Sequence, residues 1–232
     1  MFKKERQNKI IEIIEDKKYC SVEYLASKLF VAPITIRRDL SEMQKAGIIS
    51  RVHGGATIPK HKNREVPFEV RDKENYYEKE ILAQNAIKYI NIGDVIFLDA
   101  SSTVSHMVDY LKPELNVTVI TNSILIASKL QNKQITCYVT GGRTVDNSYA
   151  LLGEIAKSTI SKMHANACFF SSQGIDHDGI VSDQSEAETE LRRLMIANSD
   201  RQYLMADTSK YNKRFTFTVC DVENITDIVD VQ

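Results

Sequence analysis

The sequence predicts an α/β protein in two parts: a small helical head with a short β-hairpin, followed by an open, mainly parallel α/β domain. Three helical apolar patterns fill the first 45 residues, and a Gly54-Gly55 turn follows a short β-rich run. Beyond residue 90, β-rich runs alternate with helical stretches, which indicates right-handed crossovers and a buried parallel sheet. We expect the head at 1–57, a linker at 58–74 and the α/β domain at 75–232.

The composition is that of an ordinary globular protein. The chain has 232 residues, of which 43% are hydrophobic, and no apolar run approaches the ~20 residues of a membrane-spanning helix. The four cysteines lie far apart without a Cys-x-x-Cys pair, and no histidine spacing suggests a metal pair. We therefore expect a cytoplasmic protein with no metal, no cofactor and no membrane partner.

The charge is unevenly distributed along the chain. Residues 1–60 contain 12 Lys and Arg against 7 Asp and Glu, whereas the other 172 residues contain 18 against 24. A basic segment on an acidic body suggests a polyanion partner for the first part. A solvated basic surface would give the same count, so the charge alone leaves both interpretations open.

The helical head has the order of a winged helix-turn-helix. Ser21 is a good N-cap for the second helix, and Pro33 suits the first position of the third, which continues to about Lys45 and ends at Gly47. The run 48–52 then predicts a short strand that the Gly54-Gly55 turn folds back into a wing.

The third helix has the two faces that a recognition helix needs. Its apolar side carries Ile36, Leu40 and Met43, which we expect to pack on the other helices. The opposite side would face a DNA major groove, and arginine there can bond guanine edges or phosphates. The predicted DNA-binding residues, including flanking and wing positions, are Ser21, Ile34, Thr35, Arg37, Arg38, Ser41, Lys45, Arg51 and His53. Lys3, Lys4 and Arg6 would add phosphate contacts.

Two other interpretations of the head remain open. The Arg37-Arg38 pair is also what an ordinary solvated helix face contains, and a helix-turn-helix can serve only to dock another protein. Salt distinguishes DNA binding from docking, because each neutralised phosphate contributes a slope of about −0.9 in log affinity against log salt.

In the α/β domain, polar residues follow several predicted strands. The loops are Asp99–Thr103, Thr121–Ser123, Gly141–Arg143, Gly174–Asp176 and Asp207–Lys210. Loops at the carboxyl ends of parallel strands are where ligands bind, and hydroxyls with a lysine suit a phosphate. Each loop taken alone is better explained by helix capping, whereas five on one rim favour a ligand site.

The head closely resembles the N-terminal signature of DeoR-type bacterial transcriptional regulators. The matching residues are Glu5-Arg6, Leu25-Ala26, Thr35-Ile36-Arg37-Arg38-Asp39-Leu40, Gly47 and His53-Gly54-Gly55-Ala56. Ala32 departs from the serine that the family generally carries. The resemblance implies a regulator, most often a repressor, of a carbohydrate-metabolism operon, which a phosphorylated sugar releases from or retunes on its operator. It also implies a homo-oligomer, dimer or tetramer, on double-stranded operator DNA.

The C-terminal part resembles ribose-phosphate isomerases over Asp99–Leu111 and Ala206–Lys210. The resemblance implies that Ser101, Ser102, Thr103 and Lys210 hold a phosphate, and that Asp99, Asn122, Asp176 and Glu186 face the sugar. With the rim residues, the predicted effector site comprises Asp99, Ser101, Ser102, Thr103, Thr121, Asn122, Gly141, Gly142, Asp176, Glu186 and Lys210.

The alternative function is a sugar-phosphate isomerase-like enzyme with an attached helix-turn-helix. Isomerisation needs a general base close to the substrate carbon. The isomerases carry a Lys-Gly-Gly-rich loop where this chain has Gly179–Gln184, and Arg192 occupies the position expected for the base. The sequence therefore favours binding without turnover.

Overall fold

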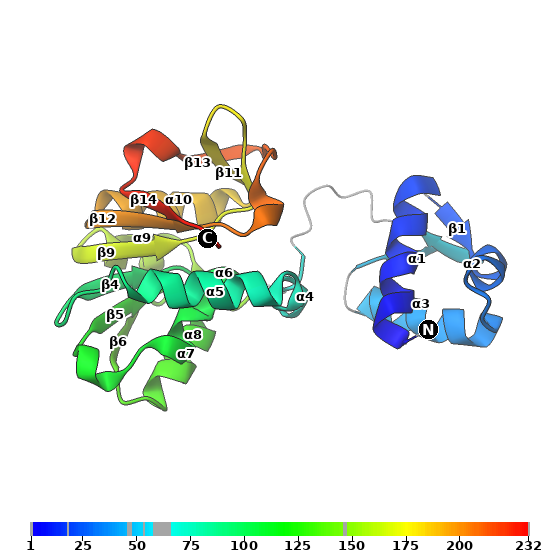
Figure 1. Cartoon of the computed structure of the whole chain (residues 1–232), viewed down its shortest axis with the longest axis horizontal. Helices are drawn as coiled ribbons and strands as arrows, with labels where there is room; N and C mark the ends of the chain where they lie inside the picture. Colours follow the sequence, from blue (N-terminus) through cyan, green and yellow to red (C-terminus); the bar gives the residue numbers. More distant parts are fainter. Residues whose placement is uncertain are drawn as a thin grey trace. The chain divides into compact units, whose positions relative to one another are not determined.

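The computed structural model describes residues 2–17, 19–45, 48–52, 54–57, 66–145 and 148–231. It contains two compact units, residues 1–67 and 68–232, each of which is considered by itself (Figure 1). Gly47 and His53, which contribute to the predictions for the head, lie outside the described residues.

The first unit is a winged helix-turn-helix, as predicted. Its elements are α1 (Lys3–Lys17), β1 (Tyr19–Ser21), α2 (Val22–Leu29), α3 (Pro33–Lys45), β2 (Ser50–Val52) and β3 (Gly55–Thr57). The strands form an antiparallel sheet in the order β1-β3-β2. Ile36, Leu40 and Met43 are buried against α1 and α2, which confirms the predicted inner face of α3.

Local sequence sets the ends of α2 and the start of α3. The Ser21 hydroxyl accepts a hydrogen bond from the Tyr24 amide at 3.1 Å, as an N-cap does. Phe30 ends α2 in the left-handed conformation, with φ of 55°, a position that usually favours glycine. Pro33 is the first residue of α3, where its missing N–H is no loss.

The second unit is built on a six-stranded sheet. Its strands are β4 (Val95–Leu98), β5 (Thr118–Thr121), β6 (Thr136–Val139), β9 (Ala165–Phe170), β12 (Ser199–Met205) and β14 (Asp227–Val229). They are all parallel, in the order β14-β12-β9-β4-β5-β6. The predicted fold class is therefore confirmed.

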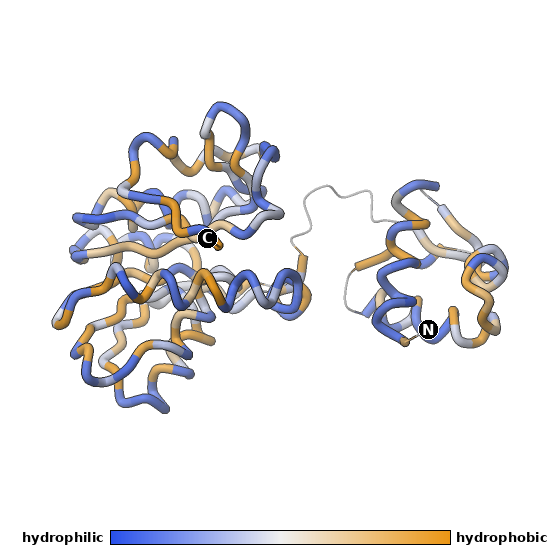
Figure 2. Tube along the Cα trace, viewed as in Figure 1, coloured by the Kyte–Doolittle hydropathy of each residue, from blue (hydrophilic) through white to orange (hydrophobic). Residues whose placement is uncertain are grey.

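Helices cover both faces of this sheet. One face packs against α5 (Tyr76–Ile87), α6 (Ser102–Ser105), α7 (Met107–Tyr110) and α8 (Ile124–Gln131), and the other against α9 (Glu154–Ile160) and α10 (Glu186–Ala197). Alternate strand residues supply the two cores, since Ile96 and Leu98 join the first and Phe97 the second. Figure 2 shows the hydrophobic residues gathered along the central strands.

The run Phe215–Cys220, expected in the parallel sheet, belongs elsewhere. It overlaps β13 (Phe217–Asp221), which pairs antiparallel with β11 (Ile180–Asp183) in a small sheet that β10 (Gly174–Ile175) completes. The connection from β12 to β13 covers only residues 206–216, with the 3₁₀ turn η2 (Thr208–Lys210), and a parallel crossover usually takes a dozen or more residues. The outer strand of the large sheet is β14 instead.

The remaining elements are short. The turn η1 (Pro113–Leu115) lies between α7 and β5, and η3 (Val222–Asn224) lies between β13 and β14. Strand β7 (Arg143–Thr144) pairs with β8 (Leu151–Leu152). Helix α4 (Phe68–Lys73) forms within the segment predicted as a linker and belongs to the second unit. None of the helices in the described ranges is long and apolar enough to cross a membrane.

The strand order creates a switch point beside β4. Strands β4, β5 and β6 proceed toward one edge, while β9, β12 and β14 proceed toward the other. The connections therefore diverge between β4 and β9, and in open α/β sheets ligands bind at the carboxyl ends of the strands at such a point.

Candidate functional site

The outer face of α3 is exposed and cationic. The Arg38 side chain is 83% exposed and that of Arg37 is 51% exposed. Arg37 lies 3.4 Å from Glu23 of α2, while Arg38 lies 3.8 Å from Glu42. Such loose surface ion pairs are weak, so both guanidinium groups can exchange these carboxylates for phosphates or base edges.

The other predicted DNA-binding residues have different environments. Ile34, Lys45 and Arg51 are exposed, and Thr35 and Ser41 are partly buried. The Ser21 hydroxyl already caps α2, which leaves it less available to a phosphate.

Arg6 has an internal partner rather than a free guanidinium. Its Nε donates to the Asp39 carboxylate at 2.5 Å, and Nη2 donates to the other oxygen at 3.2 Å. Asp39 is only 2% exposed and points inward from α3, so this pair fastens α1 to the recognition helix. Lys3 similarly pairs with Glu42 at 2.6 Å. The expected Arg6 phosphate contact is therefore not supported, because the buried Asp39 needs this cation.

In the second unit, a small pocket opens at the carboxyl ends of β4 and β9. The loops after these two strands, the helix α4 and the segment after β12 all contribute to it. Its lining comprises Arg71, Ser101, Ser102, Thr103, Ser171, Ser172, Gln173, Asp183, Arg192 and Lys210. Hydroxyl groups and cations dominate this lining, which suits an anionic ligand.

A buried lysine lies directly behind this pocket. Lys79 of α5 is 2% exposed, and its Nζ donates to the Ser102 hydroxyl at 3.2 Å and to the Arg71 carbonyl oxygen. Burial, reinforced by the nearby Lys210 charge, lowers the pKa of Lys79 to about 8. Burial also lowers the pKa of Lys210, whose ammonium lies 3.8 Å from Asp207. An anion between these two ammonium groups would offset both the desolvation cost of the charged forms and the repulsion between them.

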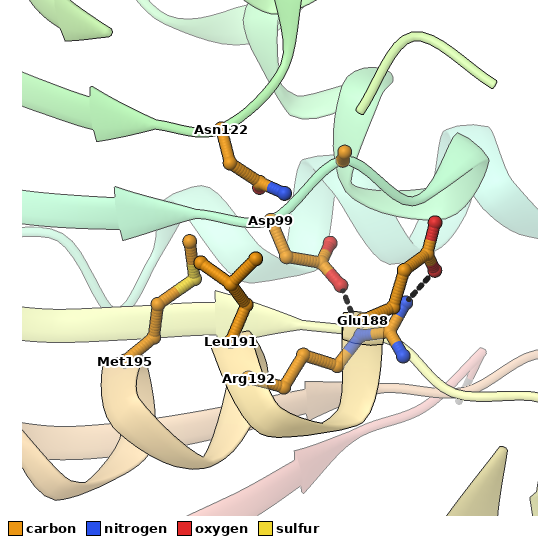
Figure 3. A pocket seen from close by; sticks show the side chains of 7 residues that line it. Asp99, Asn122, Glu188, Leu191, Arg192 and Met195 are labelled. Carbon is orange, nitrogen blue, oxygen red and sulfur yellow. Dashed lines mark hydrogen bonds and ion pairs between the residues drawn. The ribbon is translucent and has the colours of Figure 1, made fainter. Parts of the chain in front are cut away.

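The floor of the pocket is a buried ionic network centred on Arg192 of α10. The guanidinium donates to Asp99 at 2.7 Å, Asp183 at 2.8 Å and Glu188 at 2.9 Å. Figure 3 shows Arg192 extending from α10 toward Asp99 at the end of β4. Burial raises the pKa of Glu188, and the Arg192 charge opposes that shift. One guanidinium group is thus the ion-pair partner of all three carboxylates.

A second, smaller cavity also borders Arg192. Asp99, Ala100, Asn122, Glu188, Leu191, Arg192 and Met195 line it (Figure 3). Asn122 is 4% exposed; its Nδ2 donates to the Leu151 carbonyl at 3.4 Å, and its Oδ1 has no hydrogen-bond partner in the described structure. A buried amide oxygen without a donor is unfavourable, so this cavity favours a donor group of a ligand or a water molecule.

Family comparison decides the identity of both units. The DeoR-like helix-turn-helix domain matches residues 6–62, and the DeoR C terminal sensor domain matches residues 74–230. The chain belongs to the DeoR family of DNA-binding transcriptional regulators.

Relatives of the DeoR family match over nearly the whole chain. The uncharacterized HTH-type transcriptional regulator YulB of Bacillus subtilis is 37% identical, covering 97% of this chain and 87% of that protein. The L-fucose operon activator of Haemophilus influenzae is 34% identical, covering 96% and 90%. The lactose phosphotransferase system repressor of Staphylococcus epidermidis is 28% identical, covering 97% and 90%. The predicted assignment to this family is confirmed.

Among solved structures, the ribose 5-phosphate isomerase A of Methanocaldococcus jannaschii is similar in outline. It is 16% identical and covers 60% of this chain and 55% of that chain, with a TM-score of 0.45.

The DeoR sensor domain gathers some of the predicted effector residues and separates others. Ser101, Ser102, Thr103 and Lys210 line the pocket, and Asp99 and Asn122 line the smaller cavity beside it. The Ser101 hydroxyl also caps α6 and bonds Asp99 at 2.5 Å. The residues that line neither cavity are Thr121, Gly141, Gly142, Asp176 and Glu186.

The local structure around each of these five residues explains why it does not line a cavity or gives it another role. Thr121 Oγ1 accepts from the Ser123 amide, and Asp176 accepts from the Ile180 and Asp178 amides and from Arg214. Gly142 has φ of 119°, and a Cβ there would lie 2.7 Å from the Leu152 carbonyl oxygen. Gly141 also has positive φ, and Glu186 is the exposed first residue of α10.

The predicted effector residues did not include several residues that lie in the pocket or directly behind it. Arg71 and Lys79 come from helices before the sheet, and Ser171, Ser172, Gln173, Asp183 and Arg192 come from the other half of the domain. Two signals were available. Lys79 precedes Leu82, Ala83 and Ala86 at helical spacing and so shares their buried face, and three polar residues follow directly after β9.

Proposed function

We propose that this DeoR-family regulator represses a carbohydrate-metabolism operon, and that a phosphorylated sugar bound in the sensor domain releases it from, or retunes it on, its operator. The observation that carries the proposal is the pair of partly or fully buried ammonium groups, Lys79 and Lys210, beside the Ser102 hydroxyl. Two relatives are named for L-fucose and lactose systems, which supports a sugar as the effector class.

The phosphate would occupy the cationic side of the pocket. Ser102 and Thr103 would donate from the loop after β4, and Lys79 and Lys210 would neutralise the charge. Sugar hydroxyls would extend toward Ser171 and Ser172 after β9, and toward Asn122 if Arg192 shifts.

The helix-turn-helix unit would dock α3 in the major groove. Arg37 and Arg38 would contact phosphates or base edges, with Ser41, Lys45 and Arg51 beside them. Two half-sites one helical turn apart, about 34 Å, need at least a dimer, so we propose a homo-oligomer assembled by the sensor domain.

Coupling between the two sites would pass through residues 58–74. Helix α4 lies at the end of that segment, and it supplies Arg71 to the pocket while the Arg71 carbonyl accepts from Lys79. An effector can change operator affinity only by binding two arrangements of the protein with different affinity. An effector that prefers the arrangement with low operator affinity releases the protein from DNA, and one that prefers the other arrangement strengthens DNA binding.

The decisive experiment combines operator selection with an effector screen. Purified full-length protein is used to select duplexes from a random library, and a panel of sugar phosphates is then tested by thermal shift and for release of the selected duplex. An effector should raise the midpoint of unfolding by mass action and change duplex affinity. The sugar phosphate that raises the midpoint should be the one that changes duplex affinity.

A paired variant localises the effector site. Ser102→Ala with Lys210→Ala should leave duplex affinity unchanged and abolish the effector response, whereas Lys112→Ala, an exposed lysine outside the pocket, should retain it. Unchanged induction in the double variant would place the effector elsewhere.

The salt dependence tests the DNA partner. Duplex affinity should fall steeply with salt, by about −0.9 in slope per neutralised phosphate, and Arg38→Ala should cost roughly 1–3 kcal/mol of discrimination if it contacts a base. A flat response would favour protein docking by the helix-turn-helix.

We further propose that the sensor binds its sugar phosphate without turnover. Asp183 is the carboxylate in the described pocket lining, and Arg192 already neutralises it, so this carboxylate is not available as a general base. Isomerisation of a pentose phosphate by the pure protein would instead support the enzyme alternative.

A further inference from the structure

An apolar run lies at the start of the recognition helix. The five residues Phe30-Val31-Ala32-Pro33-Ile34 run from the end of α2 into the first turn of α3. Phe30 is 93% and Ile34 is 70% exposed. Ala32 and Pro33 are exposed as well. Val31 is only partly exposed and packs against the core of this unit. Three consecutive exposed apolar residues, Ala32 to Ile34, are nevertheless unusual at the start of a helix unless they contact a partner.

The position of Ile34 on α3 indicates that partner. It is the second residue of the helix and lies on the same side as Arg38 and Lys45, opposite the buried Ile36 and Leu40. The N-terminal residues of a recognition helix are those that contact base edges in the major groove. The apolar run is therefore continuous with the DNA-binding surface of the domain.

We propose that Ile34 recognises a thymine in each operator half-site through the 5-methyl group of the base. An isoleucine side chain neither donates nor accepts a hydrogen bond, and the thymine methyl is the one apolar mark that a base pair presents in the major groove. Arg38, one helical turn further along the same face, would supply the hydrogen bonds that Ile34 cannot. The proposal rests on the operator binding described above.

The test removes the methyl group without altering base pairing. In the duplex selected by the wild-type protein, each thymidine is replaced in turn by deoxyuridine, and affinity is measured by anisotropy for wild type and Ile34→Ala. At one or two positions in each half-site, deoxyuridine should weaken wild-type binding by about threefold to tenfold. Ile34→Ala should bind the thymine duplex more weakly by a similar factor, and should not distinguish thymine from uracil at those positions.

Ile155→Ala is the matched control, because Ile155 is similarly exposed, at 67%, but lies in the sensor domain. It should keep full sensitivity to deoxyuridine. Wild-type indifference to every replacement, or equal sensitivity in wild type and Ile34→Ala, overturns the proposal. Unchanged duplex affinity with a changed oligomer mass in Ile34→Ala also overturns it, because it makes the run a protein contact. Failure of the wild-type protein to select any duplex overturns operator binding itself.

Discussion

Arg192 Nε donates to Asp99 Oδ2 across 2.7 Å, and this bond joins α10 to the carboxyl end of β4. The other Asp99 oxygen accepts from the amide and hydroxyl of Ser101. Both carboxylate oxygens of Asp99 therefore already accept hydrogen bonds within the protein, and neither is free to bind a sugar hydroxyl. It orients the Ser101–Thr103 loop, and the pocket geometry depends on Arg192, which does not itself come from a loop at the rim.

Removing this arginine should destabilise the sensor domain. Arg192→Leu leaves Asp99, Asp183 and Glu188 buried without their cation, which should reduce the free energy of unfolding by about 3–5 kcal/mol. Urea unfolding followed by circular dichroism measures this loss. The neighbouring exposed Arg193 donates to the Thr218 carbonyl, and Arg193→Leu should change stability by about 0.5 kcal/mol at most. Equal losses in the two variants would contradict the role given to the network.

The buried lysine should dominate anion affinity. Lys79→Met removes one of the two ammonium groups at the pocket, so the affinity for inorganic phosphate, or for the effector found by screening, should fall about tenfold or more. Isothermal titration calorimetry provides the measurement. Lys112→Met serves as the control, because Lys112 is exposed and lies outside the pocket. A full-affinity Lys79→Met protein would show that the phosphate binds elsewhere.

The same lysine predicts a pH dependence of stability without ligand. Its pKa is lowered from 10.5 to about 8 in the folded chain, so between these values the unfolded chain binds more protons. The free energy of unfolding should therefore gain a favourable contribution from Lys79 as pH rises from about 8 to 10.5. Lys79→Met should lack this contribution, which unfolding curves across that range would reveal. An unchanged pH profile in the variant would show that Lys79 is not responsible.

Anion binding should have the opposite pH trend. A bound phosphate favours the charged ammonium, so affinity should be highest below about pH 8 and decrease above it. A sugar phosphate is already mainly dianionic at pH 7, since the second pKa of a phosphate monoester is about 6, so a decrease in affinity above pH 8 reports on the protein. Titrations at pH 7, 8 and 9 with wild type and Lys79→Met distinguish the protein from the ligand. Affinity that rises with pH in the wild type would refute the assignment.

Replacing Arg6 should reduce the stability of the helix-turn-helix unit and leave the number of phosphate contacts to DNA unchanged. Arg6→Gln leaves Asp39 buried without its ion pair, so the helix-turn-helix unit should lose about 3 kcal/mol or more of stability. Where the variant is still folded, the salt slope of duplex binding should stay as in the wild type. A slope smaller by about 0.9, with stability unchanged, would instead make Arg6 a phosphate contact.

Sequence predicts the head well because its signals are local. The Ser21 cap and the spacing of Ile36, Leu40 and Met43 depend on neighbouring residues, and the structure has both as expected. The alternation of strands and helices likewise gave the α/β class. It did not give the strand order, because Asp227–Val229 is too short to stand out, while Phe217–Asp221 has strand character but pairs with β11 instead.

The pocket shows where local signals end. Ser102, Thr103 and Lys210 follow strands and were found from that pattern. The Asp99 partner lies 93 residues further along the chain, and no local pattern pairs Arg192 with it. Arg71 and Lys79 reach the pocket from helices, where a lysine is normally solvent-exposed, so only their three-dimensional placement reveals them.

Lys79 bonds the pocket hydroxyl of Ser102 and the Arg71 carbonyl of α4 with a single ammonium group. We therefore expect a ligand in the pocket to change how strongly Lys79 holds the Arg71 carbonyl, and with it the position of α4. If α4 carries the signal to the operator, thermodynamic reciprocity fixes a second observable: operator DNA must change the dissociation constant of the sugar phosphate by the same factor by which the sugar phosphate changes that of the operator. A calorimetric titration of effector into the protein–duplex complex therefore measures this factor from effector binding, whereas a gel shift measures it from duplex binding.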